Sequence, residues 1–210
     1  MAVCPLCSSR PAKRFCPAKD RQICAICCGT KREIEIDCPS NCSYLRTGRD
    51  YEAEKGIPDP ELMARVQHID EDFLFRFTPV LNMIGREVIA ERAESSWLVD
   101  NDLVDVLKAL TTTMKTLSSG IYYESTPDGS IRQSLFRRLK RIIDHAMTPE
   151  QELLERALRP SEAIDVLEFL TVSIQTKSSN RPKSRRYLDW LASMMGISPV
   201  EESRSGLILP

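Results

Sequence analysis

Eight cysteines are the residues of this chain whose type and spacing predict a specific chemistry, and all lie within the first 42 of its 210 residues. They are Cys4, Cys7, Cys16, Cys24, Cys27, Cys28, Cys38 and Cys42. Structural zinc takes four ligands at tetrahedral corners, and cysteine thiolates are among its usual ligands. Eight thiolates therefore predict two structural zinc ions, with no ligand left over.

Most of these cysteines form short-range pairs, a spacing that lets a tight turn aim two thiolates at one ion. The pairs are Cys4–Cys7, Cys24–Cys27 and Cys38–Cys42. Cys27 and Cys28 are neighbours, and adjacent side chains leave the backbone in different directions. We therefore expect Cys27 and Cys28 to bind different ions and to tie the two sites together.

Two assignments of the ligands fit this spacing. In the interleaved assignment, the first ion takes Cys4, Cys7, Cys24 and either Cys27 or Cys28. The second ion then takes the other member of that pair together with Cys16, Cys38 and Cys42. In the sequential assignment, one ion takes Cys24, Cys27, Cys38 and Cys42, and the other takes Cys4, Cys7, Cys16 and Cys28. We favour the interleaved assignment, because interlocked loops stiffen a segment that has little other core.

The cysteine-rich segment, "CPLC…RFCPAKDRQICAICC…CPSNC", resembles the small double-zinc cross-brace fingers of the HIT, MYND and B-box types over residues 1–45. It differs from them in having no histidine, and in the sequence Pro-Ala-Lys after Cys16, where a second cysteine of a pair would stand. The resemblance implies two interleaved zinc ions and a role in protein contact.

Other cysteine chemistries compete with structural zinc. An iron–sulfur cluster also uses thiolates, a redox centre uses C-x-x-C at a helix N-terminus, and free thiols can simply fill a core. A catalytic zinc keeps an open position, usually beside histidine or carboxylate ligands. Because thiolates fill every position here, and because no nucleotide-binding, nucleophile-elbow or metalloprotease motif is present, we expect no enzymatic activity.

Composition predicts a soluble protein of the cytoplasm. The chain is 42% hydrophobic and 28% charged, with a net charge of -1, which favours neither nucleic acid nor membrane as a partner. No apolar run approaches the roughly 18 residues that span a bilayer, and the N-terminus lacks the pattern of a signal peptide. Thiols stay reduced in the cytoplasm, where they favour metal binding over disulfides.

Beyond the cysteines, apolar residues recur at helical spacing, with Pro79 as an expected break or kink. Asp100 or Asn101 is expected to cap a helix that runs through Met114. The predicted parts are a cysteine-rich two-zinc module over residues 1–45, a linker over 46–60, an all-α helical repeat domain over 61–196 and a C-terminal tail over 197–210.

An internal repeat divides the helical part. "DLVDVLKALTTTMKTLSSG" at 102–120 aligns without gaps with "EAIDVLEFLTVSIQTKSSN" at 162–180. The segments before and after these stretches also recur, and the preceding segment of the second copy predicts a short helix over 148–158. We therefore expect two similar three-helix units that pack together. The first copy carries an insertion at 120–130, which is a candidate for function.

The predicted function is that of a non-enzymatic adaptor or scaffold that contacts another protein. The apolar end of the tail, Leu207-Ile208-Leu209, is a further candidate contact. One alternative is a nucleic-acid-binding regulator that uses basic residues of the module and of a helix over 131–146. Those residues are Arg10, Lys13, Arg14, Lys19, Lys31, Arg32, Arg137, Arg138 and Arg141, with Arg181, Lys183, Arg185 and Arg186 nearby in the second copy. A thiol redox sensor is a further alternative.

Overall fold

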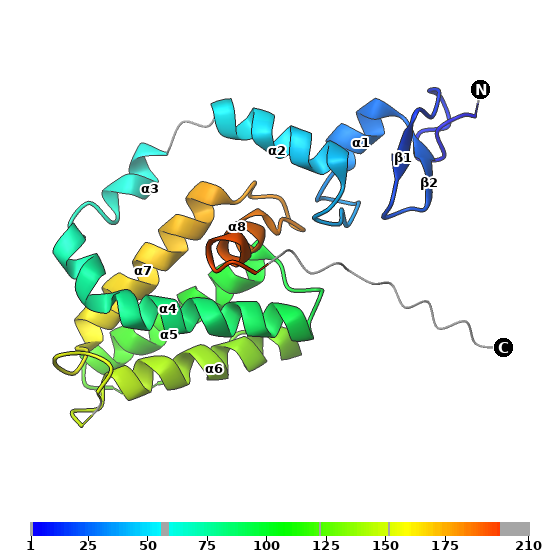
Figure 1. The fold of residues 1–210 in the computed structure, drawn as a ribbon. Helices are drawn as coiled ribbons and strands as arrows, with labels where there is room; N and C mark the ends of the chain where they lie inside the picture. Colours follow the sequence, from blue (N-terminus) through cyan, green and yellow to red (C-terminus); the bar gives the residue numbers. More distant parts are fainter. Residues whose placement is uncertain (1, 56–58, 122, 151, 198–210) are drawn as a thin grey trace.

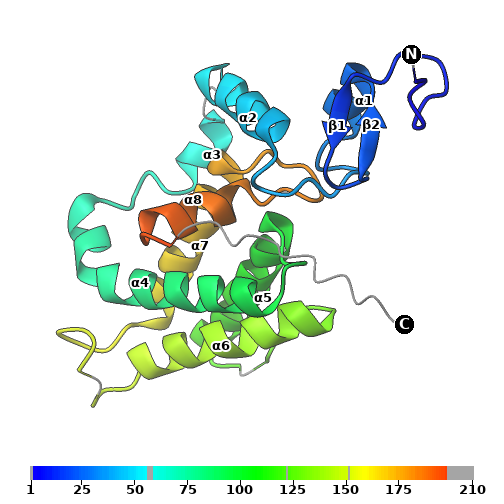
Figure 2. The ribbon, with the colours of Figure 1, turned by 45° about the vertical axis from the view of Figure 1, so that its right-hand side comes forward.

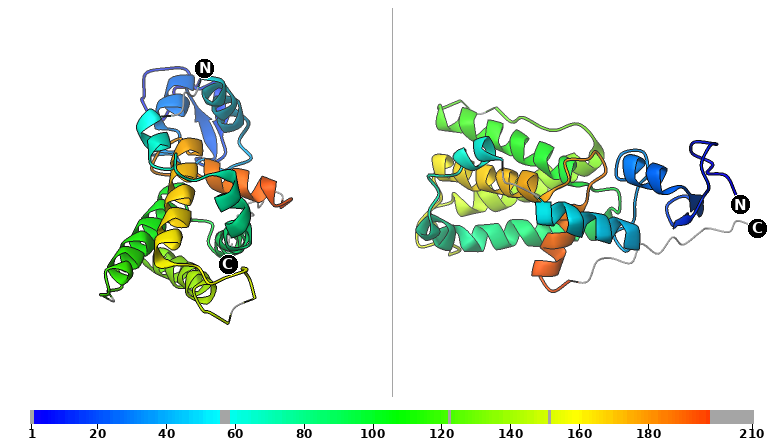
Figure 3. Two further views of the ribbon diagram at one scale, coloured as in Figure 1. Left: turned by 90° about the vertical axis from the view of Figure 1, so that its left-hand side faces the viewer. Right: turned by 90° about the horizontal axis from the view of Figure 1, so that it is seen from above.

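The computed structural model describes residues 2–55, 59–121, 123–150 and 152–197. Within these residues the chain forms one two-stranded sheet and eight helices (Figure 1). The cysteine-rich part, residues 2–45, is called the cysteine module below. It extends from one end of the helices, as the view from above shows (Figure 3).

The cysteine module is built around a short hairpin and a short helix. Strand β1 (Arg14–Cys16) pairs antiparallel with β2 (Arg21–Ile23), and α1 (Ala25–Lys31) follows. In the described part of the module, its buried cluster consists of cysteines with three other buried side chains: Ala12, Ile23 and Ile36. So few apolar side chains make a poor core, and a segment of this size usually needs a metal or disulfides.

The residues expected to form a linker are largely helical. Helix α2 (Ser43–Lys55) covers most of the stretch over 46–60, and α3 (Pro60–Ala64) follows after the undescribed residues 56–58. Gly48, which indicates a turn in the sequence, lies inside α2. A Cβ atom there would lie 1.6 Å from the Nη1 atom of Arg32. The glycine thus makes room for a neighbouring side chain rather than for a turn.

Helix α4 (Glu71–Glu94) runs through Pro79 without ending, so of the two expectations for Pro79 the break is wrong. The Asp70 side chain caps this helix by accepting a hydrogen bond from the Phe73 amide at 2.7 Å. Proline removes one backbone bond, to the carbonyl four residues earlier. That residue, Phe75, is 85% exposed, so water can reach the carbonyl.

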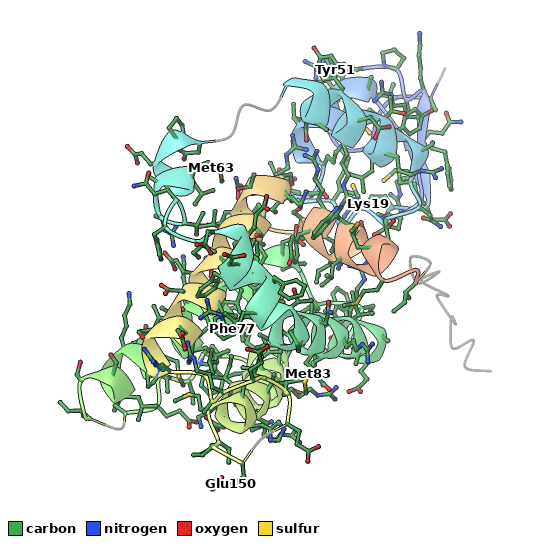
Figure 4. The ribbon with its side chains drawn as sticks, turned by 60° about the vertical axis from the view of Figure 1, so that its left-hand side comes forward. Lys19, Tyr51, Met63, Phe77, Met83 and Glu150 are labelled. Atoms are coloured by element: carbon green, nitrogen blue, oxygen red, sulfur yellow. The ribbon has the colours of Figure 1, made fainter. Side chains whose placement is uncertain are left out.

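The remaining helices enclose one apolar core. Helix α5 (Asp100–Ser118) packs on α6 (Ser130–Ala146), α7 (Pro160–Lys177) and α8 (Arg186–Met194), and α4 packs on α6 and α8. Helices α4 to α7 run alongside one another, and α8 crosses them near the cysteine module (Figures 1 and 2). Phe77 of α4 is buried in this core (Figure 4). It is separate from the buried cluster of the cysteine module.

The structure does not show two three-helix units. Helices α5 and α7 begin 60 residues apart, as the repeat predicts, and pack on each other. The helix expected over 148–158 is absent from the described residues, which form turns and bends. The amide of Leu158 donates to the carbonyl of Ala146 at 2.8 Å, so the chain must return to the end of α6. Ten helical residues would instead advance by about 15 Å.

Two further expectations bear on interaction sites. The insertion at 120–130 contains no helix up to Gly129 in its described part, and Tyr122 lies outside the described residues. The apolar end of the tail, residues 207–209, also lies outside them. No helix in the described part of the chain is both long and apolar enough to cross a bilayer.

Candidate metal centre

Four of the eight cysteines converge on one point of the cysteine module. The Sγ atoms of Cys4, Cys7, Cys24 and Cys27 all lie within 4.8 Å of one another. A tetrahedral site with Zn–S bonds of about 2.3 Å has sulfurs about 3.8 Å apart. The Sγ atoms of Cys7 and Cys24 are separated by 3.9 Å. The four side chains are therefore placed to ligate one metal ion.

Local hydrogen bonds explain why these thiols converge. The Cys4 carbonyl accepts from the Ser8 amide at 2.8 Å, which closes the turn that carries Cys7. Cys24 is the N-cap of α1, and its sulfur accepts from the Cys27 amide at 3.3 Å. A side chain at an N-cap commonly accepts from the amide three residues later. Both C-x-x-C pairs thus point their sulfurs toward one place.

Burial and hydrogen bonding shift the pKa values of the thiols in this cluster in opposite directions. Hydrogen bonds from Ser9 lower the pKa of Cys7 to about 5. Burial, with the sulfurs of Cys24, Cys7 and Cys4 nearby, raises the pKa of Cys27 to about 12. A thiol with such a raised pKa stays protonated at neutral pH unless a cation offsets its charge. Metal binding at this cluster would therefore release protons.

The other four cysteines line a common cavity, but the described residues hold no second group of thiols as close together as the first. Cys16, Cys28, Cys38 and Cys42 line a small enclosed cavity of about 10 Å³. Burial raises the pKa of Cys38 to about 11, and the charges of Cys42 and Cys16 contribute to that rise.

The side chains of Cys27 and Cys28 point in different directions because both residues lie on one helix. Cys27 and Cys28 lie on α1, and successive residues of an α-helix are about 100° apart around its axis. Cys27 joins the first cluster and Cys28 lines the second cavity. The first cluster therefore matches the interleaved assignment, and Cys27 is its fourth member. The sequential assignment, which separates Cys24 and Cys27 from Cys4 and Cys7, is not what the structure shows.

Sequence reasoning treated Arg32 only as one of several basic residues near the cysteines. Arg32 is 9% exposed and lines the second cavity. Within the described part of the chain, it forms no ion pair with a carboxylate. A signal was available, because Cys28 and Arg32 are four residues apart and such pairs share a helix face.

Several basic residues of the nucleic-acid alternative are engaged in contacts within the chain. Arg138 on α6 pairs with the three acidic residues Glu87, Glu91 and Glu94 of α4. Arg181 pairs with Glu52, Arg185 pairs with Asp37, Lys183 donates to the carbonyl of Glu35 and Arg186 donates to the carbonyl of Arg49. Most of the basic residues in the helical part of the chain thus stabilise contacts within the protein.

Comparison with known proteins identifies no relative of this chain. No protein-family model matches this chain, and no curated protein or solved structure shows significant similarity to it. The likeness to cross-brace fingers is therefore a likeness of cysteine spacing.

Proposed function

We propose that this protein is a non-enzymatic adaptor whose cysteine module binds two structural zinc ions and presents a surface to another protein. The observation that carries the metal part is the convergence of Cys4, Cys7, Cys24 and Cys27 within 4.8 Å. Four thiolates complete a tetrahedral site and leave no open position for a substrate or water. A structural role at this ion follows from that ligand set.

Two observations support the second ion. Cys16, Cys28, Cys38 and Cys42 line one small cavity, and Arg32 is buried beside them without a carboxylate partner. A buried charge normally needs a partner. Four thiolates around a divalent zinc carry a net charge of about -2, which would supply the counter-charge for Arg32.

The adaptor role rests on apolar side chains that the cysteine module leaves in solvent. Val3, Phe15 and Ile26 are 58%, 54% and 52% exposed, on a module with very few buried apolar residues. Apolar side chains that gather into one exposed patch mark contact sites, and we take these three as parts of such a patch. Zinc would serve this role by holding the surface in one shape.

Metal analysis of the purified protein tests the two-ion proposal. We expect about two zinc ions per chain, with Cys7→Ser and Cys42→Ser each losing one and Ser9→Ala losing none. Arg32→Met should weaken one ion only, and Lys31→Met, whose charge is paired with Glu35, is the matched control. Iron with visible absorbance, or one zinc ion in the unsubstituted chain, would contradict the proposal.

The contact surface is tested by capture of partners from a lysate, with and without Phe15→Ser and Ile26→Ser. A specific partner should be lost with these variants and retained with Phe75→Ser, which removes an 85% exposed aromatic from α4. The nucleic-acid alternative retains the exposed residues Arg10, Lys13 and Lys19 of the module. Binding to random RNA or DNA that weakens steeply with salt, and no captured protein, would favour that alternative.

A further inference from the structure

The cysteine module docks on the helices through charged groups rather than through a shared apolar core. Asp189 of α8 is the centre of this contact. Its carboxylate accepts from Arg49 of α2 at 2.6 Å, from Arg92 of α4 at 2.6 Å and from the Ser40 hydroxyl at 2.9 Å. All three donors are at least partly buried. One carboxylate thus joins α8 to α2, to α4 and to the module.

Glu33 anchors the same contact from the module side. It is 1% exposed, and its carboxylate binds Arg49 at 2.8 Å and accepts from the Ser179 hydroxyl at 3.1 Å. Its carbonyl accepts from the Lys183 amide at 2.8 Å. Glu33 also has a φ of 54°, a left-handed conformation that is unfavourable for such a side chain. Surrounding contacts must hold a strained residue of this kind in place.

The segment that carries these contacts also carries ligands of the proposed second ion. Asp37 binds Arg185 at 2.6 Å. It comes directly before Cys38, and Cys42 lies four residues after Cys38. Over residues 33–42 the described backbone contains no helix and no strand, only turns and one bridge between Arg32 and Ile36. Such a loop has little internal stability, so its shape depends on its attachments at both sides.

The hydrogen bonding at this contact is incomplete, although its arginines are paired with carboxylates. Three guanidinium atoms are buried without a hydrogen-bond partner among the described residues, and all belong to arginines of this interface: Arg49 Nε, Arg92 Nη1 and Arg181 Nη1. A buried N–H without an acceptor is unfavourable. A zinc ion held by thiolates that include Cys38 and Cys42 would add negative charge to the segment that meets these arginines.

We propose that zinc at the second cysteine set controls the docking of the cysteine module on α8 and on the loop between α7 and α8, with residues 33–42 as the coupling segment. This inference rests on the proposed two-ion function and adds a regulation of it. With zinc bound, the loop presents Glu33, Asp37 and Ser40 in the docked arrangement. Loss of the ion frees the loop, and the module separates from the helices while the helical core stays folded.

Coupling of this kind is reciprocal, so docking must also strengthen zinc binding at the second set. Asp189→Asn, in the full-length protein, removes the central charge from the helical side without touching a ligand. We expect its second zinc ion to be removed by a competing chelator at a concentration at least tenfold lower than in the unsubstituted protein. The first ion should be unaffected. Asp165→Asn is the matched control, since Asp165 lies on α7 and binds the exposed His68 rather than a residue of the module.

Identical chelator curves for Asp189→Asn and the unsubstituted protein, with two ions bound in each, would overturn the coupling and leave the two-ion function standing. A single ion in the unsubstituted protein would overturn both. Hydrogen exchange provides a second measurement that does not depend on Asp189. In Cys42→Ser, amides of residues 178–185 should lose protection while those of α5 keep theirs, and unchanged protection at 178–185 contradicts the proposal.

Discussion

Asp100 shows at the residue scale how one buried carboxylate holds distant segments together. The sequence suggested that it caps its own helix, and this expectation is wrong. Asp100 is 0% exposed, and its carboxylate accepts from the amides of Tyr187 and Leu188 at 3.2 Å each. It also accepts from the hydroxyls of Ser178 and Ser184 at 2.9 and 2.8 Å. It therefore caps α8, which lies more than 80 residues later in the chain.

Replacing this carboxylate should be strongly destabilising. Asp100→Ala leaves two buried amides and two buried hydroxyls without their acceptor, and we expect it to lower the free energy of unfolding by about 3 kcal/mol. Urea denaturation measures the change. Asp105→Ala removes a half-exposed carboxylate from the same helix and should cost less than about 0.5 kcal/mol. Equal effects of the two substitutions would show that Asp100 does not hold α8 in place.

At the scale of elements, the start of α7 depends on a charged pair. Glu162 lies in the first turn of α7, accepts from the Arg159 amide at 3.0 Å and binds Arg156. Arg156 lowers the pKa of Glu162 below its ordinary value of 4.5. The ionised carboxylate also suits a helix N-terminus, where the helix dipole favours negative charge.

This pair predicts a pH-dependent stability. Because the pKa of Glu162 is lower in the folded state, its contribution is present above the ordinary pKa and is lost as the pH falls through the folded value. Glu162→Gln should therefore cost about 1 kcal/mol at pH 7. At pH 3 and below the difference should shrink toward zero. Unfolding curves at both pH values check this, and a difference that grows on acidification would contradict it.

At the scale of the whole molecule, two buried clusters and a polar interface determine how the parts depend on one another. The helices have their own apolar core, so a fragment that begins at Asp59 should fold without metal. It should be less stable than the full chain with zinc, because Arg181, Arg185 and Asp189 lose their partners in the module and in α2.

The expected loss is about 3 kcal/mol, which for a chain of this size lowers the melting temperature by about 10 °C. Thermal melts followed by far-UV circular dichroism compare the fragment, the full chain with zinc and the full chain with a chelator. The chelated chain should melt close to the fragment. An insoluble or non-cooperative fragment would instead mean that the helices need the module to complete their core.

Local patterns in the sequence predicted much of the structure. The cysteine pairs at Cys4–Cys7 and Cys24–Cys27 indicated converging thiols, and the structure brings those four together. Apolar spacing predicted helices where α4 to α8 lie, and the 60-residue offset relates α5 to α7. These features could be predicted because turns and helix faces depend on residues within a few positions of one another. The segments 46–60 and 148–158 were misassigned because glycine, proline and short apolar runs have more than one local meaning.

Only the tertiary structure decided the contacts between distant residues. Which of Cys27 and Cys28 joins the first cluster depends on the rotation of α1 relative to the N-terminal turn. The Asp189 contacts, and the capping of α8 by Asp100, join residues that are 87 to 149 positions apart. No spacing rule relates such residues, because burial of separate surfaces, rather than local geometry, brings them together. The sequence alone thus indicated the four converging cysteines and most of the helices, while the fold determined how the cysteine module and the helices contact each other.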